Sequence, residues 1–198
     1  MLENNKITKT VPKYINTNDP NNFHDFCRLL NQYFDTYLPQ HRHELVLICI
    51  GTDRATGDSL GPLIGYKLKD LKYTNIKIYG TLDEPVHAKN LHDTIIHVQK
   101  THPHALVISI DACLGSVQNI GCVSIGEGSI RPGAGVQKEL PAVGDLHIIG
   151  IVNLSSAMNM SVLQNTRLSV VMKMADLIAS GVRHCSWVYS HKNKLQNR

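Results

Sequence analysis

The chain has few charged residues, few aromatic residues and no long apolar segment, and each shortage excludes a class of protein. Charged residues make up 18% of the 198 residues against 42% apolar ones, which indicates a globular rather than a disordered protein. The longest apolar runs, such as residues 45–50 and 105–110, are too short to cross a bilayer. The first ten residues are polar and lack the apolar stretch of a signal peptide, so we expect a cytoplasmic protein without a membrane partner.

Features that would bind nucleic acid are also scarce. Only 6% of the residues are aromatic, which leaves no platform for base stacking. The formal net charge of +4 comes from scattered residues, and the only dense basic stretch is residues 190–198. We interpret that stretch as a solvated tail and expect no nucleic-acid partner.

The five cysteines form no C-x-x-C pair, and their number is odd. This spacing argues against a disulfide framework and against a structural zinc site. Cys49 lies in an apolar run and is expected to be buried. Cys113 could act as a nucleophile only with a nearby base, and no base is adjacent in the sequence.

The order of apolar segments predicts a single-domain α/β protein. Strand-like runs alternate with helix-like periodicity along most of the chain, which is typical of a three-layer sandwich with a mostly parallel, doubly wound sheet. A short strand close behind its predecessor is expected to be antiparallel. We expect a polar arm over residues 1–21, one domain over residues 22–181 and a tail over residues 182–198. The predicted strands are residues 44–50, 75–80, 105–110, 121–125 (antiparallel) and 146–152, and the predicted helices are 22–38, packed on the sheet, 60–71, 88–100 and 159–180, with Gly181 closing the last.

Right-handed crossovers predict a spatial strand order that begins 2-1-3. Ligands bind such sheets at the point where the chain reverses direction, outside the carboxyl ends of the strands. Two loops are expected to meet there, residues 51–62 (GTDRATGDSLGP) and 111–116 (DACLGS). Both loops carry aspartates, so the candidate active site lies between them.

Asp58 and Asp111 are the candidate catalytic pair. Two carboxylates a few ångströms apart cannot both ionise easily, so one can serve as an acid while the other acts as a base on a water molecule. Each residue has an alternative role. Asp58 could cap the following helix, and Asp111 could bind the backbone of its own loop.

Other residues of these loops could bind a substrate. Asp53 and Arg54 lie beside Asp58 in the chain, and Arg54 could bind a substrate carboxylate or remain a surface residue. Glu84 and His87 follow the second strand and open at the same edge of the sheet. His87 with the two aspartates would make a divalent metal site, although no cofactor is required by the acid–base chemistry.

A glycine-rich segment, residues 131–136 (RPGAGV), completes the set of candidate site loops. It lacks the G-x-x-x-x-G-K-[ST] pattern of a phosphate-binding loop. We therefore interpret Gly133 and Gly135 as parts of a substrate-facing loop.

Four segments carry a resemblance to a known family: residues 50–65 (IGTDRATGDSLGPLIG), 82–91 (LDEPVHAKNL), 109–116 (SIDACLGS) and 131–145 (RPGAGVQKELPAVGD). With them, residues 44–180 resemble the YyaC-type sporulation proteins, which are often labelled spore proteases. More distantly, TGDSLGP, IDACL and PGAGVQKEL are similar to segments of the spore germination protease, an atypical aspartic peptidase on the fold of the hydrogenase-maturation peptidases.

The resemblance implies roles for particular residues. The catalytic aspartates of the germination protease fall on Asp58 and Asp111. In the hydrogenase-maturation family the equivalent acidic positions bind nickel together with a histidine, for which His87 and His147 are both candidates here. The chain is much shorter than the germination protease and lacks its propeptide, so the control of that enzyme as a zymogen does not transfer.

Three functions use the same site. The first is a peptidase that hydrolyses a protein substrate in the cytosol of a forespore or mother cell. The second is a non-catalytic sporulation factor that binds a peptide or a divalent metal in the same cleft. The third is a hydrolase of a small molecule, for which the sequence specifies no substrate. A homo-oligomer is compatible with each.

Overall fold

The structure is a computed structural model that describes residues 14–71, 75–133 and 140–196. Within these residues, six strands form one sheet in the order β1-β5-β6-β4-β2-β3. No helix in this part of the chain is long and apolar enough to span a membrane. The strands are β1 (Ile15–Asn16), β2 (Leu45–Cys49), β3 (Ile76–Tyr79), β4 (Leu106–Gly115), β5 (Cys122–Glu127) and β6 (Leu146–Leu154). The α-helices are α1 (Asn22–Tyr37), α2 (Leu60–Leu68), α3 (Leu91–Thr101), α4 (Asn159–Gln164) and α5 (Leu168–Gln196), and the short 3-10 turns are η1 (Leu38–His41), η2 (Thr56–Ser59) and η3 (Val117–Asn119).

The sheet has the predicted topology. β2 pairs in parallel with β3 on one side and with β4 on the other, which confirms the predicted order 2-1-3. β6 extends the parallel sheet beyond β4, and β5 pairs antiparallel with β6, as its short connection to β4 predicts. The switch point therefore lies between the carboxyl ends of β2 and β4, where the loop that leads to α2 meets the segment that begins at Asp111.

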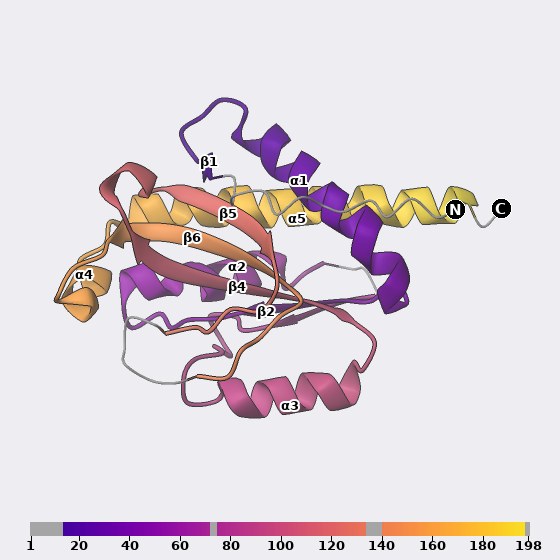
Figure 1. Ribbon diagram of the computed structural model, residues 1–198, viewed down its shortest axis with the longest axis horizontal. Coiled ribbons are helices and arrows are strands. Elements are labelled where there is room, and N and C mark those ends of the chain that lie inside the picture. Colours follow the sequence, from indigo (N-terminus) through magenta and orange to yellow (C-terminus); the bar gives the residue numbers. More distant parts are fainter. Residues whose placement is uncertain (1–13, 72–74, 134–139, 197–198) are drawn as a thin grey trace, which may run out of the picture.

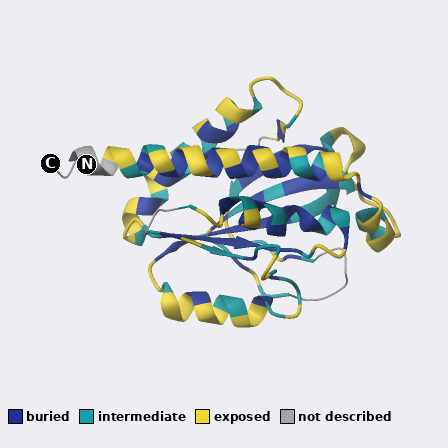
Figure 2. Ribbon diagram, turned by 180° about the vertical axis from the view of Figure 1, so that it is seen from behind, coloured by how far each residue is buried: buried dark blue, intermediate teal, exposed yellow. Residues whose placement is uncertain are grey.

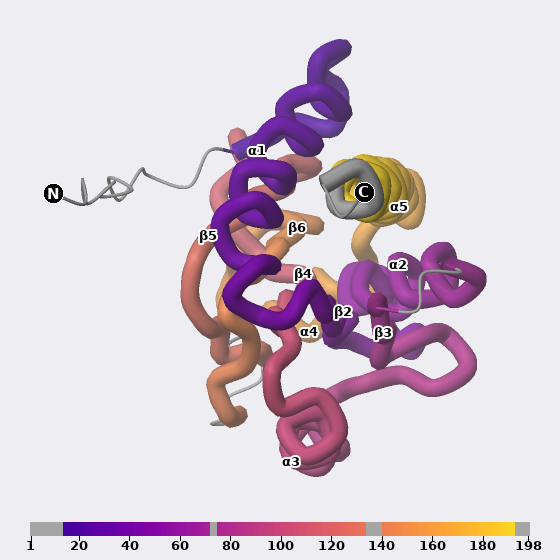
Figure 3. Tube along the Cα trace, turned by 90° about the vertical axis from the view of Figure 1, so that its right-hand side faces the viewer, coloured from indigo at the N-terminus to yellow at the C-terminus, as the bar shows by residue number. Residues whose placement is uncertain are grey.

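Helices cover both faces of this sheet, as the continuous apolar strands predict. Leu45 and Leu47 of β2 pack in the core cluster that also contains residues of α1, α2 and α5. Val46 and Ile48 point to the other face and pack with residues of α3. Figure 3 shows α3 on one side of the sheet and α1, α2 and α5 on the other. The result is the predicted three-layer sandwich.

The C-terminal helix differs from the prediction. The predicted helix over residues 159–180 is two helices, α4 and α5, and α5 passes through Gly181 and continues to Gln196. Residues 182–196 are therefore helix rather than a tail. A Cβ atom at Gly181 would overlap the ring of Phe26 on α1, so this glycine permits close packing of α1 on α5 and does not terminate a helix. Figure 2 shows buried residues recurring along one side of α5, and they include Val171, Met174, Ile178, Val182, Cys185 and Tyr189.

The N-terminal region and β4 also differ from the prediction. Ile15 and Asn16, assigned to a polar arm, form β1 on the free edge of β5, whereas residues 1–13 lie outside the described residues. β4 does not end before Asp111 but continues to Gly115, because β6 pairs with it as far as Leu154. Asp111 thus lies inside a strand, one residue beyond Ile110, the last partner of β2 in β4.

Candidate active site

The loop after β2 folds back on itself and brings Asp58 to the end of that strand. Gly51 has a φ of 141°, and a Cβ atom there would overlap the carbonyl oxygen of Asp58. The backbone N–H of Thr52 donates to that same carbonyl oxygen over 3.0 Å. Only glycine permits this contact, so the local sequence determines the position of Asp58 on η2.

Asp58 does not cap the helix that follows it. The residue at the N-cap of α2 is Ser59, and no side-chain capping hydrogen bond is formed there. The alternative role considered for Asp58 is therefore not the one that the structure shows. Its carboxyl group is free to take part in chemistry at the switch point.

Asp111 extends from β4 toward the face of the sheet that carries α3. Ile108 and Ile110 pack in the core beneath α1, α2 and α5, and successive side chains of a strand point to opposite faces. Asp111 is only 7% exposed, and one of its carboxyl oxygens accepts the backbone N–H of Ala112 over 2.8 Å. The predicted contact of Asp111 with the backbone of its own segment is thus present.

The two aspartates have different acidities. Burial raises the pKa of Asp111 well above its usual range, and the negative charge of Asp58 raises it further, against the hydrogen bond from Ala112. Burial also raises the pKa of Asp58, but only to about 6, because a backbone hydrogen bond from Thr52 and the Coulombic effect of His87 oppose it. Asp58 is therefore the carboxyl group that ionises more readily, and Asp111 holds its proton to higher pH.

His87 is held beside this pair by backbone pairing. Val86 forms a parallel bridge with Ile50, and its carbonyl accepts the N–H of Gly51 over 2.8 Å. The side chain of Asn90 accepts the N–H of His87 over 2.8 Å and fixes the turn. The buried Nδ1 atom of His87 has no hydrogen-bond partner among the described residues. A buried nitrogen without a partner is rare and marks a candidate position for a ligand.

The remaining candidate site residues are exposed or partly buried, except for one that lies outside the described residues. Asp53 and Arg54 are exposed on the loop that carries Asp58, and Arg54 forms no ion pair with any described residue. Glu84 is exposed and shapes the loop of His87 through its backbone, since its N–H donates to the Thr81 hydroxyl oxygen. Gly133 is partly buried with a φ of 74°, and Gly135 lies outside the described residues.

No hydrogen bond among the described residues joins His147 to the aspartate pair. It pairs with Ser109 in the sheet, two positions before the pairing of Asp111 with Ile149. Its Nδ1 atom lies 3.0 Å from the carbonyl oxygen of Gly128. Of the two candidate histidines, only His87 acts on Asp58.

No three-ligand metal centre is formed by the described residues. No group of three or more His, Cys, Asp or Glu side chains in this part of the chain is placed to hold a metal ion. Asp58, Asp111 and His87 are neighbours, and their role in binding a divalent metal stays a prediction.

Cys113 is a poor nucleophile in this structure. Burial raises the pKa of its thiol to about 11, and the charge of Asp111 adds to the effect. Attack requires the thiolate, which is scarce at neutral pH under these conditions.

The contact between α4 and the loop of Asp58 was not predicted from the sequence. A Cβ atom at Gly57 would lie 2.8 Å from the hydroxyl oxygen of Thr166 and 3.1 Å from the Cα atom of Leu163. The short helix therefore packs directly on η2. The glycine before Asp58 was the available signal, but its partner is distant in the chain.

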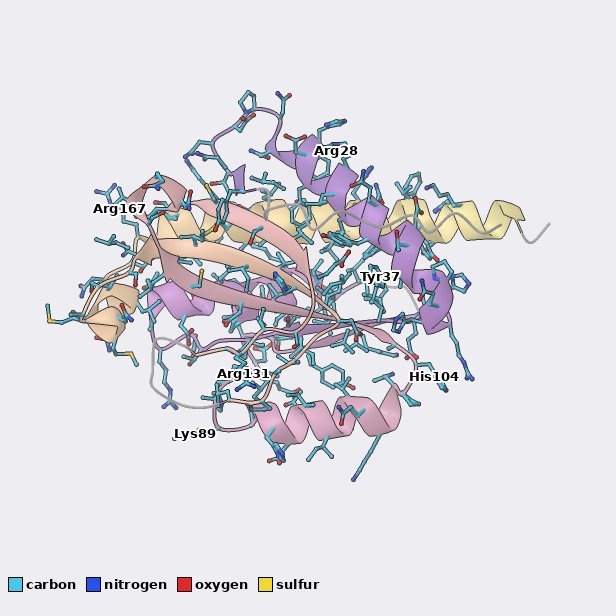
Figure 4. All side chains as sticks on the ribbon, viewed as in Figure 1. Arg28, Tyr37, Lys89, His104, Arg131 and Arg167 are labelled. Atoms are coloured by element: carbon cyan, nitrogen blue, oxygen red, sulfur yellow. The ribbon has the colours of Figure 1, made fainter. Side chains whose placement is uncertain are left out.

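Two further exposed cations lie on the side of the sheet where α3 lies. Figure 4 shows them there: Lys89, from the loop that carries His87, and Arg131, from the loop after β5.

Comparison with known proteins identifies first the fold and then the family. The chain is similar to the crystal structure of the NiFe hydrogenase maturation protease HycI from Thermococcus kodakarensis KOD1, with a TM-score of 0.56 and 17% identity, over 80% of this chain and 98% of that one. It is 54% identical to the uncharacterized protein YyaC of Bacillus subtilis (strain 168) over 155 residues, which cover 77% of this chain and 76% of YyaC. Residues 14–181 match the family described as protein of unknown function DUF1256, and the chain belongs to that family.

Proposed function

We propose that the protein is a peptidase that hydrolyses a polypeptide with Asp58 and Asp111. The observation that carries the proposal is the difference between the two carboxyl groups: burial and the charge of Asp58 favour the protonated form of Asp111, whereas Thr52 and His87 favour the carboxylate of Asp58. A pair of acids whose surroundings separate their pKa values is suited to acid–base catalysis. The fold shared with a maturation protease supports the same class of reaction.

In this mechanism Asp58 is the base and Asp111 the acid. Asp58 takes a proton from a water molecule as the water oxygen attacks the carbonyl carbon of the scissile peptide. Asp111 donates its proton to the carbonyl oxygen, which gives a tetrahedral diol. On collapse, Asp58 returns its proton to the leaving amine and Asp111 regains a proton from a hydroxyl group. Both aspartates end in their starting states.

Place and substrate follow from the resemblance to the sporulation proteins rather than from the site. We propose that the enzyme acts in the cytosol of a spore-forming cell, on a protein of the forespore or the mother cell. The relative YyaC supports this assignment only by its sequence identity.

The test compares the wild type with Asp58→Asn and Asp111→Asn in a forespore protein extract, with new N-termini identified by mass spectrometry. Asp93→Asn, which changes an exposed aspartate on α3, is the matched control. We expect discrete new termini with the wild type and the control and none with the two site variants. If the wild-type and Asp111→Asn samples contain the same N-termini, the result would favour a non-catalytic factor that binds a peptide at the same site.

A further inference from the structure

Exposed apolar side chains gather at one end of the molecule. The four most exposed large apolar side chains in the described part of the chain are Met158 (73%), Val117 (66%), Leu168 (56%) and Met160 (50%). They follow the carboxyl ends of β4 and β6 in the chain, and Leu154, also exposed, is the last residue of β6. Figure 1 shows η3, α4 and the start of α5 at this same end. We call the five side chains the apolar end surface.

This surface adjoins the aspartate pair. α4 carries Met160 and follows Met158, and it packs on η2 through the contacts of Gly57 with Leu163 and Thr166. η2 carries Asp58. A polypeptide bound across the site would therefore pass beside α4. Flexible, polarizable methionine side chains are common at surfaces that accept varied apolar partners.

The charge of the surrounding chain restricts what can bind there. Residues 112–126 contain no charged side chain, and residues 146–175 contain no aspartate or glutamate. Arg167, labelled at this end in Figure 4, is exposed and forms no ion pair with a described residue. A segment with apolar side chains and neutral or acidic neighbours is complementary to this surface, whereas a basic segment is not.

We propose that the apolar end surface docks an extended apolar segment of the polypeptide substrate next to the scissile bond. The inference rests on the proposed function and specifies its substrate class: a chain whose apolar residues have neutral or acidic neighbours. Five side chains fit a peptide better than a second copy of this protein, because a stable dimer interface takes roughly 20–30 residues from each partner.

The test uses synthetic fluorescent 15-residue peptides with an apolar centre and acidic, neutral or basic flanks. Binding is measured by anisotropy with Asp111→Asn protein, with and without the changes Met158→Ser and Met160→Ser. Trp187→Ser on α5 is the control, because Trp187 is 49% exposed and lies far from η2. We expect acidic or neutral peptides to bind, and the two methionine changes to weaken binding at least about tenfold, because they remove apolar side chains that the peptide would cover.

The outcomes separate the two proposals. Peptides that bind through the methionines but are not cleaved by wild-type protein would support the docking surface and contradict the peptidase. Cleavage that the methionine changes do not slow, with equal peptide binding, would overturn the docking surface and leave the peptidase intact. Absence of binding by every peptide also overturns the docking surface. The docking surface is also overturned if sedimentation shows a dimer that the methionine changes dissociate while peptide binding stays unchanged.

Discussion

At the scale of residues, the chemistry depends on how differently two aspartates are surrounded. Asp111 is almost fully buried and has one backbone hydrogen bond, whereas Asp58 has both a backbone donor and a nearby histidine. In water the two carboxyl groups would have nearly the same acidity. Burial and one neighbouring charge are therefore what assign the roles of acid and base.

The pH dependence of cleavage should follow this assignment. The rate is expected to rise with pH through about 6, as Asp58 ionises, and to fall at higher pH when Asp111 loses its proton. His87→Gln removes the charge that favours ionised Asp58, so the acid limb should move to higher pH. The check is kcat/KM against pH for both proteins, with His92→Gln, which changes an exposed histidine on α3, as the control. An acid limb that stays in place would show that His87 does not act on Asp58.

The same shift makes stability depend on pH. Because the pKa of Asp58 is raised from 3.8 to about 6, folding favours its protonated form, and this contribution is lost as pH rises from about 4 to above 6. The loss is on the order of 2–3 kcal/mol. In urea unfolding at pH 4 and pH 8, Asp58→Asn should lose less stability than the wild type over this interval. Equal losses in the two proteins would mean that Asp58 is not desolvated.

At the scale of elements, the long helix α5 organises the molecule on one face of the sheet. It packs against α1 and α2, and its N-terminal part lies near η2, the turn with Asp58. Gly181 is the point of closest approach between α1 and α5, where a Cβ atom would come within 2.5 Å of a ring carbon of Phe26. The helix pair is thus specified by a small residue facing a large one.

Gly181→Ala should lower the free energy of unfolding by about 1–3 kcal/mol, the usual range for overpacking. Ala is the better helix former, so a gain of about 1 kcal/mol would be expected if the contact did not matter. Thermal and urea unfolding would measure the change, with exposed Ser180→Ala as the control. The second change Phe26→Leu should recover part of the loss by making room for the methyl group. Without that recovery, the loss would not come from packing on Phe26.

At the scale of the whole molecule, the C-terminal segment belongs to the core. Three of its side chains are buried: Val182, Cys185 and Tyr189. The hydroxyl group of Tyr189 lies 2.7 Å from Nδ1 of His43, which lies in the chain between η1 and β2. The phenol ring also meets Phe34 edge-on, with ring centroids 6.2 Å apart. The last part of α5 therefore packs against both α1 and the segment that leads into β2.

Truncation after residue 181 should prevent a stable fold. It removes three buried side chains worth roughly 5 kcal/mol together, which is comparable to the total stability of a typical domain. Circular dichroism during heating should show no cooperative transition, whereas a chain truncated after Lys192 should unfold much like the full protein. A cooperative transition at an unchanged temperature in the shorter chain would show that the last turns of α5 are dispensable.

The amino-acid sequence by itself determined the sheet and the position of the aspartate pair. Continuous apolar strands such as residues 45–49 must be covered on both faces, and right-handed crossovers then place β2 between β3 and β4. Asp58 and Asp111 follow from this topology, since both lie near the carboxyl ends of neighbouring strands. These features depend on local pattern and chain connectivity, which can be read without coordinates.

Only the tertiary structure decided the features that depend on distant partners. Gly181 is equally suited to end a helix or to admit a neighbouring ring, and the position of Phe26 selects the second. β4 continues past Asp111 because β6 supplies its hydrogen bonds. The acidities of the two aspartates differ because burial is a property of the assembled core and not of a residue's neighbours in the chain.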